Sequence, residues 1–156
     1  YDAIVDMHRK GLDTSALDEN IADMAPATPR QQRIYLRVAT GYKKFLKQGK
    51  MTWFEPPMRD YSLGPVSVRV NPEIGLLIDG RPHAIKLYFR GDPLSPQRTM
   101  VVNQLLSNAL SATWPGTVFA VLDVRRAKLY PFRPKSEIGL LLKAEANSFS
   151  SLWSAL

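Results

Sequence analysis

The hydrophobic and polar positions of this chain follow a helical period in some segments and a strand period in others. Between residues 29 and 48 the apolar side chains fall on one arc of a helix, whereas residues 66–70 and 83–89 alternate as strands do. Residues 117–124 are almost continuously apolar, which predicts a strand covered on both faces. We therefore expect residues 118–122 to form a buried interior strand of a sheet.

Turn and capping residues divide the chain into a definite order of elements. Thr28-Pro29-Arg30-Gln31 forms a capping box with proline at the first helical position, and Gly49 is a stop signal for the helix that follows. The other expected elements are helices over 2–10, 15–24, 96–112 and 144–156, strands over 66–70, 74–78, 83–89, 117–124 and 127–132, and a loop over 51–65. Residues 138–142 fit either a strand or a helix start. This order predicts a mixed α/β fold with an αβββαβ-type core flanked by helices.

The distribution of charge says more about domain organisation and partners than the rest of the composition does. The 156 residues include 21 Lys and Arg against 14 Asp and Glu, a net charge of +7. Six acids and two bases lie in residues 1–28, so residues 29–156 carry a net charge of +11. We expect an acidic N-terminal helical segment over 1–28 and a basic α/β domain over 29–156. A basic body favours anionic partners such as nucleic acid, although the same charge also serves solubility.

The clearest charge pattern lies on the long helix expected over 29–48. Five bases share the arc opposite the apolar arc: Arg30, Arg33, Arg37, Lys44 and Lys47. No acid occurs between Pro29 and Phe54 to relieve the repulsion among them, which costs about a few tenths of a kcal/mol per like pair. We expect these five bases to contact nucleic acid, together with Arg125 and Arg126.

Several classes of function are excluded by what the chain lacks. It has no cysteine, which excludes a disulfide scaffold, a thiolate zinc site and a cysteine nucleophile, and its two histidines are too few for a histidine-only metal site. It has no phosphate-binding glycine loop and no Gly-x-Ser-x-Gly elbow. No apolar run approaches 18 residues, so we expect no membrane partner and a cytoplasmic protein.

One pair of residues suggests catalysis. Asp79 ends the strand expected over 74–78, and Lys86 lies in the strand expected over 83–89. With the order of elements from residue 29 to about 124, this pair resembles the core of the restriction-endonuclease-like superfamily, the PD-(D/E)xK nucleases. The resemblance implies that an acid ending the second strand and an acid-x-Lys on the third hold Mg²⁺ and activate water for phosphodiester cleavage. It makes Asp79 a metal ligand and Lys86 a catalytic residue, with both side chains in one pocket.

The chain departs from that motif at one position. Ala84-Ile85-Lys86 stands where the family has acid-x-Lys, so the second metal carboxylate is missing. Glu73 is the candidate replacement as a metal ligand, although an extended strand would separate it from Asp79 by about 20 Å. Asp79-Gly80 is also an ordinary hairpin turn pair, which by itself accounts for Asp79.

Three functions stay open at this point. The first is a nucleic-acid-binding protein related to metal-dependent nucleases, with Mg²⁺ as cofactor if it is catalytic. The second is a non-catalytic module that docks nucleic acid or an acidic protein partner with its basic face. The third is an assembly subunit, a homo-oligomer among the possibilities, whose terminal helix packs on a partner through Trp153 and Leu156.

Overall fold

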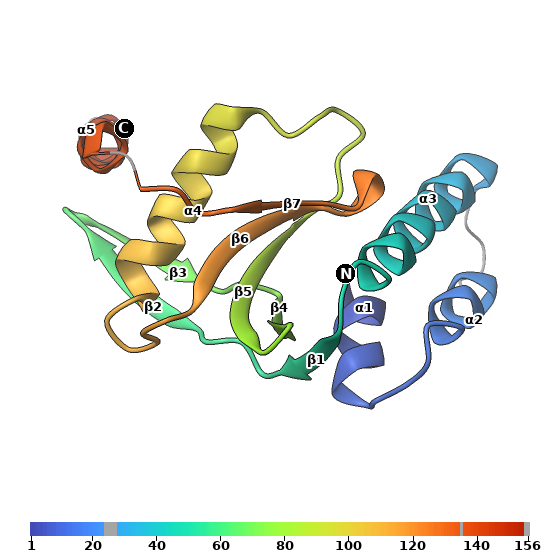
Figure 1. Cartoon of the computed structure of the whole chain (residues 1–156). Coiled ribbons are helices and arrows are strands. Elements are labelled where there is room, and N and C mark those ends of the chain that lie inside the picture. Colours follow the sequence, from blue (N-terminus) through green and yellow to red (C-terminus); the bar gives the residue numbers. More distant parts are fainter. Residues whose placement is uncertain (24–27, 135, 155–156) are drawn as a thin grey trace.

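The computed structural model describes residues 1–23, 28–134 and 136–154, and in the last helix it describes the side chains of 138–144 and 146–148. The fold is mixed α/β, as the sequence predicts. A five-stranded sheet carries helices on both faces, and a two-stranded hairpin lies beside it (Figure 1).

The elements follow the predicted order with shifted bounds. The helices are α1 (Asp2–Arg9), α2 (Ala16–Asp23), α3 (Pro29–Leu46), α4 (Pro96–Leu110) and α5 (Ser136–Ser154), and η1 (Val124–Arg126) is a 3₁₀ turn. The strands are β1 (Met51–Phe54), β2 (Arg59–Leu63), β3 (Val66–Val70), β4 (Ile74–Ile78), β5 (Arg81–Tyr88), β6 (Val118–Asp123) and β7 (Lys128–Pro131). Residues 138–142 are therefore helical. The stripe expected on the last helix, with Trp153 and Leu156, lies outside the described side chains.

The main sheet has the strand order β1-β4-β5-β6-β7. Strands β5 and β6 are parallel, and the other neighbours are antiparallel. Strand β6 lies between two others, and every residue in it after Val118 is buried. The prediction of a buried interior strand is confirmed, because a strand covered on both faces has no need of polar alternation.

The segment expected to be a loop over 51–65 is corrected by the structure, because it contains two strands. Strand β1 pairs with β4 at the edge of the main sheet, whereas β2 pairs with β3 in the separate hairpin. Residues 66–70 therefore form a strand as expected, but not in the main sheet. Along the chain, the elements that build the sheet and its two flanking helices are α3, β1, β4, β5, α4, β6 and β7.

The two faces of the sheet bury different helices. On one face α1, α2 and α3 share a core with the sheet, and the fully or nearly fully buried members include Ile4, Leu17, Tyr42, Phe45, Ile85 and Leu122. On the other face α4 packs over Ala84 and Phe119. The acidic segment over 1–28 thus contributes apolar side chains to the same core as the basic part of the chain.

The local start signals act as the sequence predicts. In the capping box of α3, the Thr28 hydroxyl accepts from the Gln31 amide at 3.3 Å and the Gln31 side chain accepts from the Thr28 amide at 2.8 Å. Ser95 caps α4 in the same way by accepting from the Arg98 amide. Because both helix starts are fixed locally, the side chains that each helix presents are set by its period.

Candidate nucleic-acid interface

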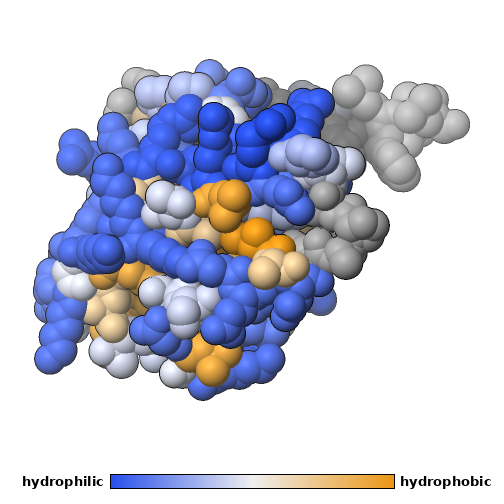
Figure 2. Space-filling model, turned by 90° about the vertical axis from the view of Figure 1, so that its right-hand side faces the viewer, coloured by the Kyte–Doolittle hydropathy of each residue, from blue (hydrophilic) through white to orange (hydrophobic). Residues whose placement is uncertain are grey.

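The five bases predicted to form one stripe are all exposed. Four of them lie on α3, and the fifth, Lys47, is the C-cap residue of this helix. The opposite side of this helix is anchored by Tyr42 and Phe45, whose exposed fractions are 0% and 1%. Within the residues that the structure describes, none of the five forms an ion pair or a side-chain hydrogen bond with an acid. The face of the molecule that carries α1 to α3 is mostly hydrophilic and has small apolar patches (Figure 2).

In its described residues, 1–23 and 28, the acidic segment forms no ion pair with this stripe. Its ion pairs join Asp18 to Lys43 and Asp6 to Lys10, and the basic Arg9 pairs with Glu55. Lys43 belongs to α3 but not to the stripe. The charge of the five bases therefore remains available to a partner.

A recess joins the stripe to the bases that follow β6. Its volume is about 350 Å³, and it lies between α3, η1 and the loop at Gly91. The residues that line it are Arg37, Thr40, Gly41, Lys44, Gly91, Arg125 and Arg126. We call it the α3–η1 recess. A second hollow, lined by Arg30, Arg33, Ile34 and Arg37, adjoins it through the shared Arg37.

Gly41 sets the geometry of this recess. A Cβ atom at this position would lie 2.1 Å from the Val124 carbonyl oxygen and 3.0 Å from the Arg125 Cα atom. Only glycine therefore lets α3 pack this closely against η1. The sequence analysis did not single out Gly41, although an isolated glycine inside a strong helical pattern is a recognised sign of close packing.

Arg126 is held in place by a buried acid. Its Nη1 atom lies 3.0 Å from Oδ2 of Asp123, whose side chain is fully buried, and its Nη2 atom donates to the Gly91 carbonyl at 2.7 Å. The Asp123 Oδ1 atom also accepts from the Arg126 amide and so caps η1. Asp123 thus fixes Arg126 at the wall of the recess and balances its charge.

Arg125 is placed differently. Its Nε atom is buried and has no hydrogen-bond partner among the described residues. A buried donor without a partner costs about 1–3 kcal/mol. The recess is lined by three cations that pair with no described acid: Arg37, Lys44 and Arg125.

The residues expected to be catalytic are not brought together. Asp79 lies in the β4–β5 turn with φ +50°, and its Oδ1 atom accepts from the Lys50 amide at 3.2 Å. Asp79 stabilises the β4–β5 turn and connects it through this hydrogen bond to the residue before β1. Glu73 precedes β4 and Asp79 follows it, so about 20 Å of extended chain separates them. The expectations of an Asp79–Glu73 metal site and of a pocket shared by Asp79 and Lys86 do not hold.

Lys86 instead pairs with Glu73. The Lys86 ammonium forms an ion pair with the Glu73 carboxylate and donates to the Asn71 carbonyl at 3.1 Å. The second Glu73 oxygen accepts from the Leu87 amide at 2.7 Å. Both oxygens of this carboxylate are thus engaged, and the pair joins the segment before β4 to the end of β5.

The position of the missing carboxylate is closed off from solvent. Ala84 has an exposed fraction of 0% and packs in the core under Leu106 and Leu110 of α4. Within residues 1–23, 28–134 and 136–154, no three or more potential ligands of the His, Cys, Asp and Glu types are grouped to hold a metal ion.

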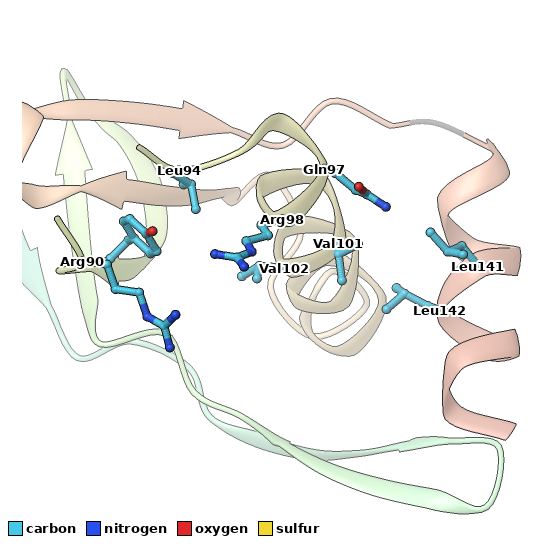
Figure 3. A pocket seen from close by; sticks show the side chains of 9 residues that line it. Arg90, Leu94, Gln97, Arg98, Val101, Val102, Leu141 and Leu142 are labelled. Atoms are coloured by element: carbon cyan, nitrogen blue, oxygen red, sulfur yellow. The ribbon is translucent and has the colours of Figure 1, made fainter. Parts of the chain in front are cut away.

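A larger cavity of about 720 Å³ lies on the α4 side of the molecule. Figure 3 shows Arg90 and Arg98 extending into it, with Leu141 and Leu142 of α5 facing it from the other side. The other lining residues are the polar Gln97, Tyr88 and the apolar Leu94, Val101 and Val102. It contains none of the residues that the sequence predicted to be functional.

No known protein-family model, curated protein or solved structure matches this chain. In the described part of the chain, no helix is both long enough and apolar enough to cross a membrane.

Proposed function

We propose that this protein binds nucleic acid through the exposed face of α3 and the adjoining α3–η1 recess. The observation that carries the proposal is the convergence of unpaired bases from two distant segments. Arg37 and Lys44 come from α3, and Arg125 comes from η1, 88 residues after Arg37 and 81 after Lys44. A solvated helix face needs no such convergence, and phosphate oxygens are the usual partners of grouped guanidinium groups.

The interface would act mainly on the phosphate backbone. From Arg30 to Lys44 the stripe extends along α3 for about 21 Å, which is long enough to follow several phosphates of one strand. Contacts of this kind position a protein on a nucleic acid but do not select its sequence. We therefore expect affinity for many sequences, and we propose an intracellular location where nucleic acid is accessible.

Binding without cleavage is the form of this function that we favour. The relation to PD-(D/E)xK nucleases remains a proposal, supported by the order of α3, β1, β4, β5, α4 and β6 and by the ion pair of Glu73 with Lys86. The place of the second acid is the buried Ala84, and Asp79 is engaged at the other end of the hairpin. In this proposal the catalytic pattern is degenerate, and binding does not depend on Mg²⁺.

A salt titration with charge-reversed variants tests the proposal. Arg33→Glu with Arg37→Glu places two acids on the exposed face of α3. The matched control, Arg59→Glu with Arg133→Glu, reverses two exposed arginines on β2 and after β7, away from α3 (Figure 1). Duplex and single-stranded DNA and RNA are titrated with each protein at several salt concentrations, with and without Mg²⁺.

Each phosphate that the protein neutralises contributes about 0.9 to the log–log salt slope for a duplex and about 0.7 for a single strand. We expect the α3 variant to lose at least about two such contacts on every sequence tested and the control to retain wild-type affinity. If wild type binds none of these nucleic acids at low salt, the proposal is refuted, and an acidic protein becomes the better candidate partner. Mg²⁺-dependent cleavage would show instead that the catalytic pattern is active.

A further inference from the structure

We propose that the α3–η1 recess is a seat for the terminal phosphate of a nucleic-acid chain. This inference rests on the proposed function and adds a preference for one kind of chain end. The exposed stripe can contact any phosphate of a backbone. The recess differs from the stripe in its charge, its depth and the placement of its donors.

The charge of the recess exceeds what an internal phosphodiester supplies. Arg37, Lys44 and Arg125 have no acid partner among the described residues, whereas Arg126 is balanced by Asp123. An internal phosphodiester carries one negative charge, and a phosphomonoester carries about −1.5 to −2 at pH 7. Three unpaired cations around one hollow therefore match a terminal phosphate better than an internal one.

The donors of the recess are arranged before any ligand binds. Asp123 and the Gly91 carbonyl hold the Arg126 guanidinium, and close packing of Gly41 fixes η1 against α3. Arg125 lines the same recess and has no acid partner among the described residues. A phosphate in this recess would gain charge-assisted hydrogen bonds, and little side-chain freedom would be lost on binding.

The size of the recess fits one end of a chain. A volume of about 350 Å³ lies at the lower end of the range for small-ligand sites, roughly 300–1,000 Å³. Such a space accommodates a phosphate with its attached sugar. The neighbouring hollow at Arg30 and Arg33 continues along α3 and offers bases to the phosphates that follow.

The test compares chain ends. Three single strands of identical sequence carry a 5′-phosphate, a 3′-phosphate or hydroxyl groups at both ends, and the affinity of each is measured at one fixed salt concentration. Lys44→Gln removes an exposed charge of the recess, and Arg125→Lys keeps the charge but removes the planar guanidinium group, whose fork of donors suits phosphate oxygens. Arg33→Gln is the matched control, because it removes one charge of the stripe outside the recess. Thermal melting checks that each variant is folded.

We expect wild type to prefer one phosphorylated end over the hydroxyl-ended strand by about tenfold, equivalent to about 1.4 kcal/mol. Lys44→Gln and Arg125→Lys should each reduce this ratio to threefold or less, whereas Arg33→Gln should weaken all three strands and leave the ratio unchanged. Equal binding of the three strands by wild type would overturn this inference and leave the proposed function intact. Binding of none of them would refute both.

Discussion

At the residue scale, Gly41 has the most specific structural role in the candidate interface. Its hydrogen takes the place where a methyl group would overlap the Val124 carbonyl oxygen, and both partners are backbone. Neither can move without separating α3 from η1. The interface therefore depends on a residue that carries no charge.

The first prediction is that Gly41→Ala destabilises the protein, although alanine is the better helix former by about 1 kcal/mol. The methyl group would force apart two packed backbones, and overpacking of this kind costs about 1–3 kcal/mol. Urea unfolding measures the change. Gly139→Ala is the control, since a Cβ there has no neighbour within 4 Å and should not destabilise α5. A Gly41→Ala protein as stable as wild type would contradict the close packing.

A second residue-scale prediction concerns the ion pair of Glu73 and Lys86. The two side chains are 11% and 35% exposed, and Glu73→Gln would leave a half-buried ammonium without its counter-charge. We expect a loss of about 1–3 kcal/mol of stability, below the value for a fully buried pair because water reaches Lys86.

A double-mutant cycle tests this structural role and shows whether the pair also contributes to nucleic-acid binding. Adding Lys86→Met to Glu73→Gln removes the stranded charge and should restore part of the lost stability. Nucleic-acid affinity should be the same in all four proteins, because the pair does not line the recess. Additive losses in the double variant would show that the two side chains do not stabilise each other.

At the scale of elements, the docking of α1 on α3 predicts a pH dependence. The Nε2 atom of His8 on α1 lies 2.5 Å from the hydroxyl oxygen of Tyr42, which belongs to the core on α3. Burial lowers the pKa of His8 to about 4, and burial also raises the pKa of Tyr42. Both groups are thus neutral at pH 7.

The sign of the effect follows from proton uptake on unfolding. Between pH 6.5 and about 4 the unfolded chain binds a proton at His8 and the folded chain does not, so stability is complete above pH 6.5 and falls as the pH decreases through this window. We expect a loss on the order of 1–3 kcal/mol by pH 4. Carboxylates titrate in the same range, so the measurement is the difference between wild type and His8→Gln in chemical unfolding from pH 7 to pH 4. A constant difference would contradict this role for His8.

The elements also show which features the sequence could predict. The interior strand β6, the capping box of α3 and the basic stripe follow from runs, caps and periods that lie within one segment. Strands β1 and β2 were missed because they are only four and five residues long, are partly exposed and are separated by Pro56-Pro57. Such strands form through pairing with distant partners rather than through their own pattern.

The candidate site also combines features encoded within one segment, which the sequence could predict, with features that depend on distant segments, which it could not. The bases of α3 could be assigned to one face from the helical period, but their meeting with Arg125 depends on the approach of Gly41 to η1, which no local pattern encodes. The pairing of Glu73 with Lys86 could have been predicted from the sequence. A two-residue turn at Asp79-Gly80 pairs Ile74 with Ile85, and the next step of that register places residue 73 opposite residue 86.

At the scale of the whole molecule, the acidic segment over 1–28 and the basic part of the chain are joined by one core. Charge alone suggests that removing the segment would strengthen nucleic-acid binding, since it holds six acids and two bases. Packing argues the opposite, because Ile4, Val5, Met7 and Leu17 are each at most 8% exposed against the rest of the core. The comparison of magnitudes decides between the two effects.

Burying each of these four side chains is worth about 1.5–3 kcal/mol, and their sum is comparable with the total stability of an ordinary domain, about 5–15 kcal/mol. We therefore expect a chain that begins at Thr28 to lose its cooperative thermal transition, as measured by circular dichroism. Glu19→Gln with Asp23→Asn is the matched comparison, because it removes two exposed acids of α2 that form no ion pair with another described residue, and it leaves the core intact. It should melt close to wild type and bind nucleic acid at least as tightly. A shortened chain that melts cooperatively and binds more tightly would show that the segment is a removable cover rather than part of the fold.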